Sequence, residues 1–435
     1  MRSRREFLLE STITALGAGS RWRAHAAEHV SELLASLPPC NAETLAQDEG
    51  FWHRVRGAFV LEPSLINLNH GLSPSPRAVL EAFARDIDRV NRAPLLHLIG
   101  PHEGRREEVR ARAAVFLGCD AEELAITRSA TEALQIIQLG LELGPGDEVL
   151  STNEDYWAMW NTWQQRVHRD GITYSEVKFS PPYPAPEEIV ARFEQAITPR
   201  TRALLFCHMT WLTGHVLPVR DICVMARSKG VRTIVDGAHA VAHIPFRLRD
   251  LECDYYGSCG HKWLQAPLGT GFLYVRREHI RDLWPLTPAW EKVREDIRKF
   301  EWVGSSAPAA HNAIADALDF QQRLGVERKA ARLHYLKRRW AERLGRHPAV
   351  RILTDLTLAR SCGIGAFAIE GIEPETLARY LLERHRILVF AFGKDEYDGP
   401  PGIRVAPQVY TSAPEIDRFS EVVESVLRTG LPSPP

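Results

Sequence analysis

The sequence predicts an α/β protein with a largely parallel sheet and a smaller second α/β domain towards the C-terminus. Short apolar runs alternate with helical patterns through the middle of the chain, and Pro-Gly turns such as Gly144-Pro145-Gly146 separate them. Helices are expected over 130–141 and 186–196. Seven runs have the length and apolar content of buried strands: 124–127, 148–151, 173–177, 203–208, 233–236, 255–258 and 271–275.

The pattern changes near residue 307, where long amphipathic helices begin, and strand-like runs such as 365–369 follow. We therefore expect an N-terminal helical segment over 27–64, a large domain over 65–305 and a small C-terminal domain over 306–435. A chain of 435 residues with 45% hydrophobic residues is long enough for such an arrangement. Its net charge of -1 gives no electrostatic reason to expect nucleic acid or an anionic membrane as partner.

The N-terminus carries an export signal pattern. Ser3-Arg4-Arg5-Glu6-Phe7-Leu8 matches the twin-arginine motif, and the apolar stretch over 8–18 is too short and too polar to span a bilayer. Ala24-His25-Ala26 has the small-x-small form of a cleavage site. The sequence predicts a twin-arginine signal peptide over 1–26 and a periplasmic protein; the alternative is an arginine-rich leader on a cytoplasmic one.

The seven cysteines are scattered, odd in number and without a CxxC pair. We predict neither a disulfide framework nor a metal site.

Two segments point to a specific chemistry. Lys262 lies in Gly260-His261-Lys262-Trp263, and Asp236 closes the apolar run Thr233-Ile234-Val235. The chain has eight lysines against 46 arginines, so a lysine in this setting is an unlikely surface charge. A lysine amine that forms a Schiff base and a carboxylate that pairs with a pyridine nitrogen are what a pyridoxal phosphate (PLP) enzyme requires.

A phosphate site is predicted where a strand runs into a helix at Thr127-Arg128-Ser129-Ala130-Thr131-Glu132-Ala133. The start of that helix offers unpaired N–H groups and hydroxyls to an anion. A plain capping box, Ser129-x-x-Glu132, explains the same residues without a ligand. Ser258 and His261 are close enough to Lys262 in sequence to contact the same phosphate.

With these motifs in place, the chain resembles the class V aminotransferase family of fold-type I PLP enzymes, most of all its isopenicillin N epimerase-like branch. Cysteine desulfurases belong to the same family. The similarity runs from about residue 65 to 419, and its segments follow the family's order. They are Asn67-Leu68-Asn69-His70-Gly71, Ser129-Ala130-Thr131-Glu132-Ala133, Thr213-Gly214, Leu217-Pro218-Val219, Asp236-Gly237-Ala238-His239, Gly260-His261-Lys262-Trp263, and Arg404 before Tyr410 and Ile416-Asp417-Arg418-Phe419.

The resemblance implies a role for each matching residue. Lys262 is the Schiff-base lysine and Asp236 the partner of the pyridine nitrogen, and Arg404 grips the substrate α-carboxylate through its planar fork. Asn69 and His70 are expected beside the substrate. The remaining cofactor contacts are assigned to Ala130, Thr131, Ser258 and His261 at the phosphate, Tyr156 stacked on the ring, His239 near the phenolic oxygen, the Thr210 hydroxyl, and Ser305 from the neighbouring subunit of a homodimer.

The reaction stays open, because transamination, epimerisation and elimination share these residues. The resemblance implies an enzyme acting on the α-amino group or Cα of an amino acid or amino-acid-derived substrate, of aminotransferase or epimerase type. The alternatives are a C–S or β-elimination lyase, an exported tailoring enzyme of a secreted peptide metabolite and, last, a non-catalytic binding protein on the same fold. Desulfuration needs a mobile nucleophilic cysteine in the small domain, and Cys362 precedes an expected strand, which disfavours it.

Overall fold

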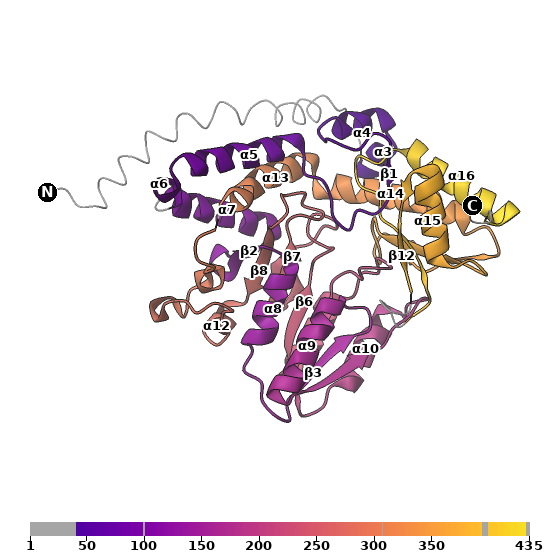
Figure 1. Ribbon diagram of the computed structural model, residues 1–435. Coiled ribbons are helices and arrows are strands. Elements are labelled where there is room, and N and C mark those ends of the chain that lie inside the picture. Colours follow the sequence, from indigo (N-terminus) through magenta and orange to yellow (C-terminus); the bar gives the residue numbers. More distant parts are fainter. Residues whose placement is uncertain (1–40, 99–100, 307, 394–398, 432–435) are drawn as a thin grey trace.

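The computed structural model describes residues 41–98, 101–306, 308–393 and 399–431 (Figure 1). The predicted signal peptide over 1–26 lies outside the described residues. Among the described helices, none combines the length and the apolar content needed to cross a membrane.

The large domain is built on a mixed, mostly parallel sheet of seven strands, as predicted. The strands lie in the order β2-β8-β7-β6-β5-β3-β4, and only β8 runs antiparallel to its neighbours. Each predicted strand is present within two residues of its expected ends. Their bounds are β2 (Leu124–Thr127), β3 (Glu148–Thr152), β4 (Thr173–Val177), β5 (Thr201–Cys207), β6 (Arg232–Asp236), β7 (Tyr255–Cys259) and β8 (Gly271–Val275).

Both faces of this sheet are covered, so its strands are apolar on both sides. Side chains alternate between two hydrophobic clusters: Leu204 and Phe206 of β5 pack into one, and Ala203 and Leu205 into the other. The helices after the first strands are α8 (Ala130–Gly140), α9 (Trp157–Asp170), α10 (Pro186–Ala196), α11 (Val219–Ser228) and the short α12 (Arg277–Ile280).

The structure places one helix differently from the predicted domain boundary at 305/306. Helix α13 (Ala309–Leu324) packs against α5 (Arg77–Arg92) and α7 (Pro101–Leu117), with the short α6 (Pro94–Leu98) between those two in the chain (Figure 1). Ile314 and Leu318 of α13 belong to the same apolar cluster as the large sheet. An amphipathic pattern shows that a helix has an apolar face, but it does not say which domain covers that face.

The small domain follows α13. Its four-stranded antiparallel sheet has the order β12-β13-β10-β9, and the strand predicted over 365–369 is β10. The strands are β9 (Val350–Ile352), β10 (Gly365–Ile369), β12 (Phe390–Phe392) and β13 (Gly402–Val405), and the helices are α14 (Val326–Leu344), α15 (Pro374–His385) and α16 (Ala413–Thr429).

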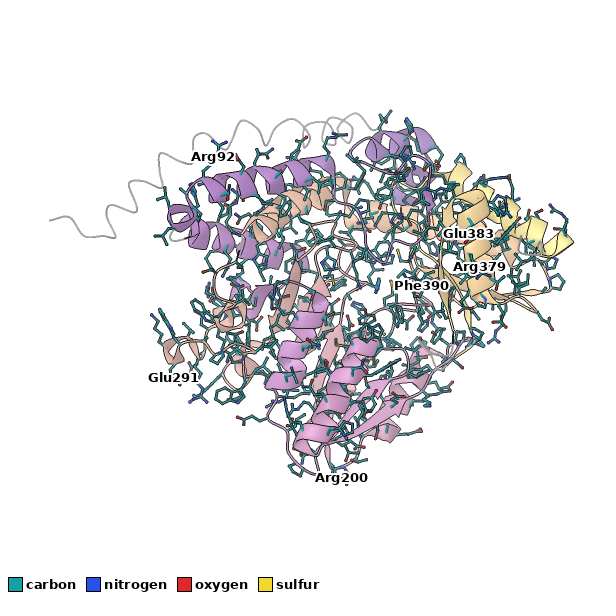
Figure 2. All side chains as sticks on the ribbon, in the orientation of Figure 1. Arg92, Arg200, Glu291, Arg379, Glu383 and Phe390 are labelled. Atoms are coloured by element: carbon teal, nitrogen blue, oxygen red, sulfur yellow. The ribbon has the colours of Figure 1, made fainter. Side chains whose placement is uncertain are left out.

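The first described segment belongs with the small domain. Helices α3 (Ala42–Ala46) and α4 (Glu49–Arg56) precede the large domain, and α3 packs against α14. Strand β1 (Ile66–Asn67) pairs in parallel with β11 (Ile387–Leu388). The chain therefore runs along the small domain before it enters the large one, and this path brings Asn69 next to β13. Figure 2 shows Phe390 of β12 on the side of the small domain that faces the large one.

Candidate active site

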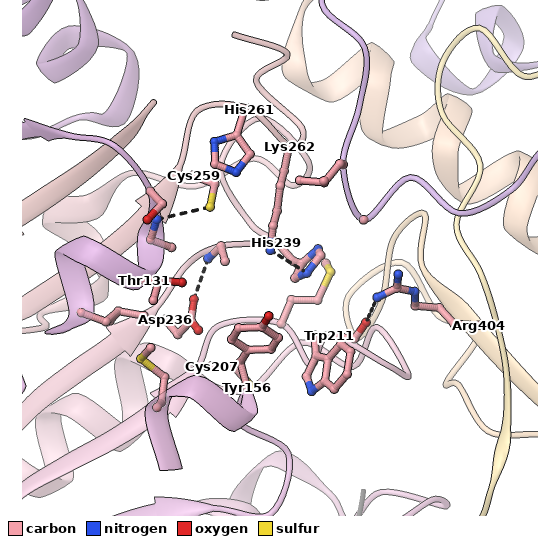
Figure 3. A pocket seen from close by; sticks show the side chains of 18 of the residues that line it. Thr131, Tyr156, Cys207, Trp211, Asp236, His239, Cys259, His261, Lys262 and Arg404 are labelled. Carbon is pink, nitrogen blue, oxygen red and sulfur yellow. Dashed lines mark hydrogen bonds between the residues drawn. The ribbon is translucent and has the colours of Figure 1, made fainter. Parts of the chain in front are cut away.

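A cavity of about 410 Å³ lies at the carboxyl ends of β5, β6 and β7, where open α/β sheets bind ligands. The start of α8 forms one wall, and Arg404 of the small domain faces it from the other side (Figure 3). Phe390 of the small domain also lines the cavity. Its lining residues are Asn69, Gly71, Leu72, Ser129, Ala130, Thr131, Leu134, Tyr156, Met159, Cys207, Met209, Trp211, Asp236, Ala238, His239, Cys259, His261, Lys262, Phe390 and Arg404.

Lys262 enters this cavity from the turn that follows β7. The turn is tight: a Cβ on Gly260 would lie 2.6 Å from Thr270 Oγ1. The Lys262 Nζ lies 3.1 Å from His239 Nε2, which comes from the segment after β6. The predicted lysine and histidine therefore meet, and the amine faces open space in the cavity (Figure 3).

Asp236 ends β6 and points into the same cavity (Figure 3). Its Oδ1 accepts the Ala238 backbone N–H at 2.9 Å. Burial raises the pKa of Asp236 above its ordinary value, while the Ala238 N–H and the nearby Lys262 oppose that rise. A cationic ring N–H in the cavity would offset the cost of burying this carboxylate.

The start of α8 has features of both interpretations of its sequence, the helix cap and the phosphate site. Ser129 caps the helix by accepting the Glu132 N–H at 3.1 Å, which is half of the predicted capping box; the Glu132 carboxylate accepts the Arg128 N–H instead of the Ser129 N–H. Ala130 and Thr131, in the first turn, line the cavity as the phosphate interpretation requires. His261 lines it too, with Nδ1 donating to the Thr270 carbonyl at 2.9 Å, which leaves Nε2 for a ligand. Burial lowers the pKa of His261.

Ser258 requires a correction. Its hydroxyl donates to the Gly237 carbonyl at 2.9 Å, and its side chain lies outside the cavity. The next residue, Cys259, lines the cavity instead, and its Sγ accepts the Ala130 N–H at 3.3 Å. Because successive side chains of a strand point to opposite faces, only one of these two residues of β7 can face the helix start. The alternation of side chains along the strand was the signal that would have identified Cys259, and not Ser258, as the residue facing the cavity.

Thr210 and His70 also face away from the cavity. The Thr210 hydroxyl accepts the His215 N–H at 2.7 Å and bonds Thr213 Oγ1 at 2.6 Å, so it stabilises its own turn. His70 is buried with Nδ1 3.1 Å from the Tyr410 hydroxyl, and burial lowers its pKa to about 4. In both cases the neighbours line the cavity: Met209 and Trp211 beside Thr210, and Asn69 and Gly71 beside His70.

Arg404 lies on β13 and is almost fully buried. Its two terminal nitrogens donate to Asn69 Oδ1 at 2.7 Å and to the Trp211 carbonyl at 2.9 Å. The buried Nε–H has no partner among the described residues. The guanidinium lies 4.7 Å from the centre of the Phe390 ring, and burial lowers its pKa to about 10. Buried donors left over in a cavity wall suit a carboxylate.

The aromatic wall comes from three segments. Tyr156 immediately precedes α9 and packs edge-on to Trp211, with ring centres 5.5 Å apart. Phe390 lies beyond Trp211. Sequence reasoning placed Tyr156 in the site, whereas Phe390 carried no local signal, because its strand reaches the cavity only through domain packing.

Ser305 is exposed and does not line the cavity of its own chain. Its predicted contact concerns a neighbouring subunit and stays a prediction. Within the described ranges, no group of three or more histidine, cysteine or acidic side chains is placed to hold a metal ion.

A lysine, an acidic residue, the start of a helix and an arginine meet in one cavity on this fold, and a PLP site requires such a set. The aminotransferase class-V family model matches residues 66–419, and the chain belongs to that family of fold-type I, PLP-dependent enzymes.

Curated relatives fall into two groups. The chain is 29% identical to isopenicillin N epimerase of Streptomyces clavuligerus, over 86% of this chain and 98% of that protein. It is 27% identical to a probable cysteine desulfurase of Xylella fastidiosa, over 76% of this chain and 83% of that protein.

Solved structures show the same fold. The apo cysteine desulfurase of Thermococcus onnurineus superposes with a TM-score of 0.75 at 22% identity, covering 87% of this chain and 98% of that one. A mutant of C-DES with glycine covalently linked to its PLP cofactor has a TM-score of 0.73 at 24% identity, covering 85% and 98%.

Proposed function

We propose that the chain acts on the α-amino group or the Cα of an amino acid or amino-acid-derived substrate, as an epimerase or an aminotransferase. One observation carries the proposal: the Lys262 amine, the Asp236 carboxylate and the Arg404 guanidinium face a single cavity from three separate elements. The likeness to isopenicillin N epimerases over nearly their whole length supports it.

The cavity residues have separate roles: some bind the cofactor, one moves a proton, and others orient the substrate. PLP, when bound, supplies an aldehyde that condenses with amines and a ring that accepts electrons from Cα. Ala130, Thr131, Cys259 and His261 are placed to hold its phosphate, and Asp236 to hold its ring nitrogen. Lys262 provides an amine that moves a proton at Nζ, and Arg404 with Asn69 orients the substrate carboxylate. Trp211 and Phe390 help to exclude water from that end.

Cysteine chemistry argues against desulfuration. Cys362, in the small domain, is fully buried, and its Sγ lies 3.4 Å from the His243 carbonyl. Burial raises the pKa of Cys362 to about 12, so its thiol stays protonated. Cys207 and Cys259 line the cavity but come from strands of the large domain. A β-elimination lyase would use the same residues as an epimerase, and the products distinguish the two.

The test uses the purified protein and a panel of amino acids. An imine at Lys262 gives an absorption band at about 410–430 nm, the range expected for this chemistry. Incubation in D₂O should place deuterium at Cα of an accepted amino acid, and chiral and keto-acid analysis then reports epimerised, transaminated or eliminated product. Lys262→Ala should lose the band and the exchange. A Lys262→Ala protein that kept both would contradict the proposal.

Two further features are proposed with it. We propose that the mature protein is periplasmic, on the basis of the Ser3–Leu8 motif. Arg4→Lys with Arg5→Lys should keep it in the cytoplasm in a fractionation experiment.

We also propose a homodimer in which Ser305 of one subunit reaches the other's cavity. Leu72, which is 55% exposed while lining the cavity, and Trp302, 52% exposed near Ser305, support such a contact. Light scattering should give twice the chain mass, and Ser305→Ala should weaken cofactor retention.

A further inference from the structure

Three side chains form a hydrogen-bonded row that ends at Lys262. The Trp263 indole N–H donates to His239 Nδ1 at 3.2 Å. The other ring nitrogen, His239 Nε2, lies 3.1 Å from Lys262 Nζ. Trp263 and His239 are both buried, so the hydrogen bond between them is shielded from water, whereas the contact with Lys262 borders the cavity.

The chemistry of the indole decides the direction of the row. An indole nitrogen donates and never accepts, so His239 Nδ1 has to be the acceptor. An imidazole that accepts at Nδ1 is neutral and carries its proton on Nε2. His239 Nε2 is then the donor, and the Lys262 nitrogen accepts through its lone pair.

The surroundings of His239 favour this neutral form. Burial lowers the pKa of His239 well below its ordinary value, and the charged and titratable groups that face it, Lys262, Arg404 and His243, lower it further. A positive charge on any of these groups, such as that of the Arg404 guanidinium, would repel a second proton on the ring.

The indole itself is held so that it cannot turn away. Its ring stacks on His243 with centres 3.6 Å apart. His243 Nδ1 donates to the His239 carbonyl at 2.7 Å, and its Nε2 accepts the Gly363 N–H at 2.8 Å. The Trp263 carbonyl accepts a hydrogen bond from the buried Lys329 ammonium. Two parts of the small domain thus hold Trp263: Gly363 acts through His243, and Lys329 of α14 acts through the Trp263 carbonyl.

We infer that Trp263 is a positioning residue: it fixes His239 in the tautomer protonated on Nε2, so that an N–H donor always faces the nitrogen of Lys262. The inference rests on the proposed function only for the role of Lys262. It assigns Trp263 a task beyond packing, since a phenylalanine would fill most of the same space without the N–H.

The first experiment observes the tautomer directly. [¹⁵N]histidine is incorporated into the protein as purified, and nitrogen NMR reports which ring nitrogen of His239 bears the proton. His239→Gln identifies the His239 signals by their loss. We expect a protonated Nε2 and a bare Nδ1 in the wild type, and a mixture of tautomers in Trp263→Phe.

The matched control is Trp340→Phe. Trp340 is fully buried in the small-domain core beside Phe367, and its indole N–H has no partner among the described residues. This variant undergoes the same chemical change without losing a hydrogen bond, so the His239 signals should stay as in the wild type. A wild-type His239 protonated on Nδ1, or an unchanged tautomer in Trp263→Phe, would overturn the inference.

The second experiment titrates the cofactor band with pH. A donor facing the Lys262 nitrogen favours the form in which that nitrogen has a free lone pair. Trp263→Phe should therefore raise the midpoint by about half to one pH unit, the size expected for one hydrogen bond. Trp340→Phe should leave it in place.

Glutamine at position 239 separates the tautomer from packing. A glutamine amide accepts with its oxygen and donates with its nitrogen, and it has no tautomers to fix. In a His239→Gln background the Trp263→Phe change should move the midpoint by less than about 0.2 units, well below one hydrogen bond's worth. An equal shift in both backgrounds would reduce Trp263 to a packing residue.

The two experiments also tell two failures apart. A wild-type protein that never shows the band refutes the proposed function, while the NMR result still decides the tautomer. A protein with the band but a freely exchanging His239 refutes only the role of Trp263.

Discussion

Basic side chains that line the cavity and basic side chains along α14 are held in opposite ways. Arg404 keeps an unpaired Nε–H, and the contact recorded for Lys262 Nζ is with His239. Lys329 instead bonds the Trp263 carbonyl and Gln321 Oε1, and Lys337 bonds the Ser361 hydroxyl. Both α14 lysines are fully buried. Arg404 is buried like the two α14 lysines, so burial alone does not mark function; a position in the cavity wall does.

Two carboxylates, Asp155 and Asp236, differ in the same way. Asp155 Oδ2 accepts the Ser151 hydroxyl at 2.8 Å, the Thr152 N–H at 2.7 Å and the Thr152 hydroxyl at 2.9 Å. Asp236 accepts the Ala238 N–H and otherwise faces the cavity. The first carboxylate organises its own turn, and the second is available to a ligand.

We expect the largest effect from a substitution of Asp236, the carboxylate that faces the cavity. Asp236→Asn removes the charge that would face a cationic ring nitrogen, and losing one partner of a buried pair costs about 3–5 kcal/mol. We expect kcat/KM to fall by about 10²- to 10⁴-fold. Asp155→Asn is the matched control, because Asn can still accept from Ser151 and Thr152, and its activity should stay within about threefold. Equal losses in the two variants, measured by steady-state kinetics, would erase the distinction between them.

Arg404 should give the next largest effect. Arg404→Lys keeps a positive charge but loses the planar fork that binds a carboxylate through two parallel bonds. We expect KM to rise by about 30- to 100-fold, from one or two lost charge-assisted hydrogen bonds of about 1.5–3 kcal/mol. The band of the bound cofactor should remain. Unchanged KM for an accepted amino acid would remove Arg404 from substrate binding.

The buried Lys329 of α14 is tested by measuring how the free energy of unfolding depends on pH. Burial lowers the pKa of Lys329 from 10.5 to about 7, so between these values the unfolded chain binds more protons than the native one. Stability contributed at this position therefore rises with pH through that window and is lowest below pH 7. The free energy of unfolding should gain about 2 kcal/mol from pH 7 to pH 9 through Lys329. Urea titrations of wild type and Lys329→Met isolate this part, since other groups contribute equally to both; parallel pH profiles would contradict it.

The sequence predicted what depends on local pattern and chain order. Buried strands read as apolar runs, and Asp236 and Lys262, at or just after the ends of two of them, line one cavity because parallel strands end at one edge of a sheet. Arg404 was found only through the family resemblance, since nothing near it in sequence indicates the cavity.

The sequence could not predict on which side of the chain a given side chain lies. Ser258, Thr210 and His70 each lie one residue from a side chain that lines the cavity. A shift of one position reverses the side on which a side chain lies in extended chain, and spacing in the sequence does not reveal the register of the turn. Phe390 and helix α13 depend on how two domains pack, which is information carried by contacts distant in sequence.

The smallest effect concerns this one-residue difference at β7. Cys259 accepts the Ala130 N–H at the helix start, whereas Ser258 donates to the Gly237 carbonyl on the other side of the strand. Cys259→Ser replaces a weak thiol with a stronger hydrogen-bonding hydroxyl, so the Kd for PLP should fall by about three- to tenfold, or about 1 kcal/mol. Ser258→Ala should leave that Kd unchanged and lower the free energy of unfolding by about 1 kcal/mol, because it removes one buried hydrogen bond, while the Gly237 carbonyl keeps the Ala240 N–H. Fluorescence titration of apoprotein with PLP and urea unfolding measure the two quantities. If Ser258→Ala weakened PLP binding while Cys259→Ser did not alter it, the phosphate contact would belong to Ser258, and the side of β7 that faces the ligand would have to be reassigned.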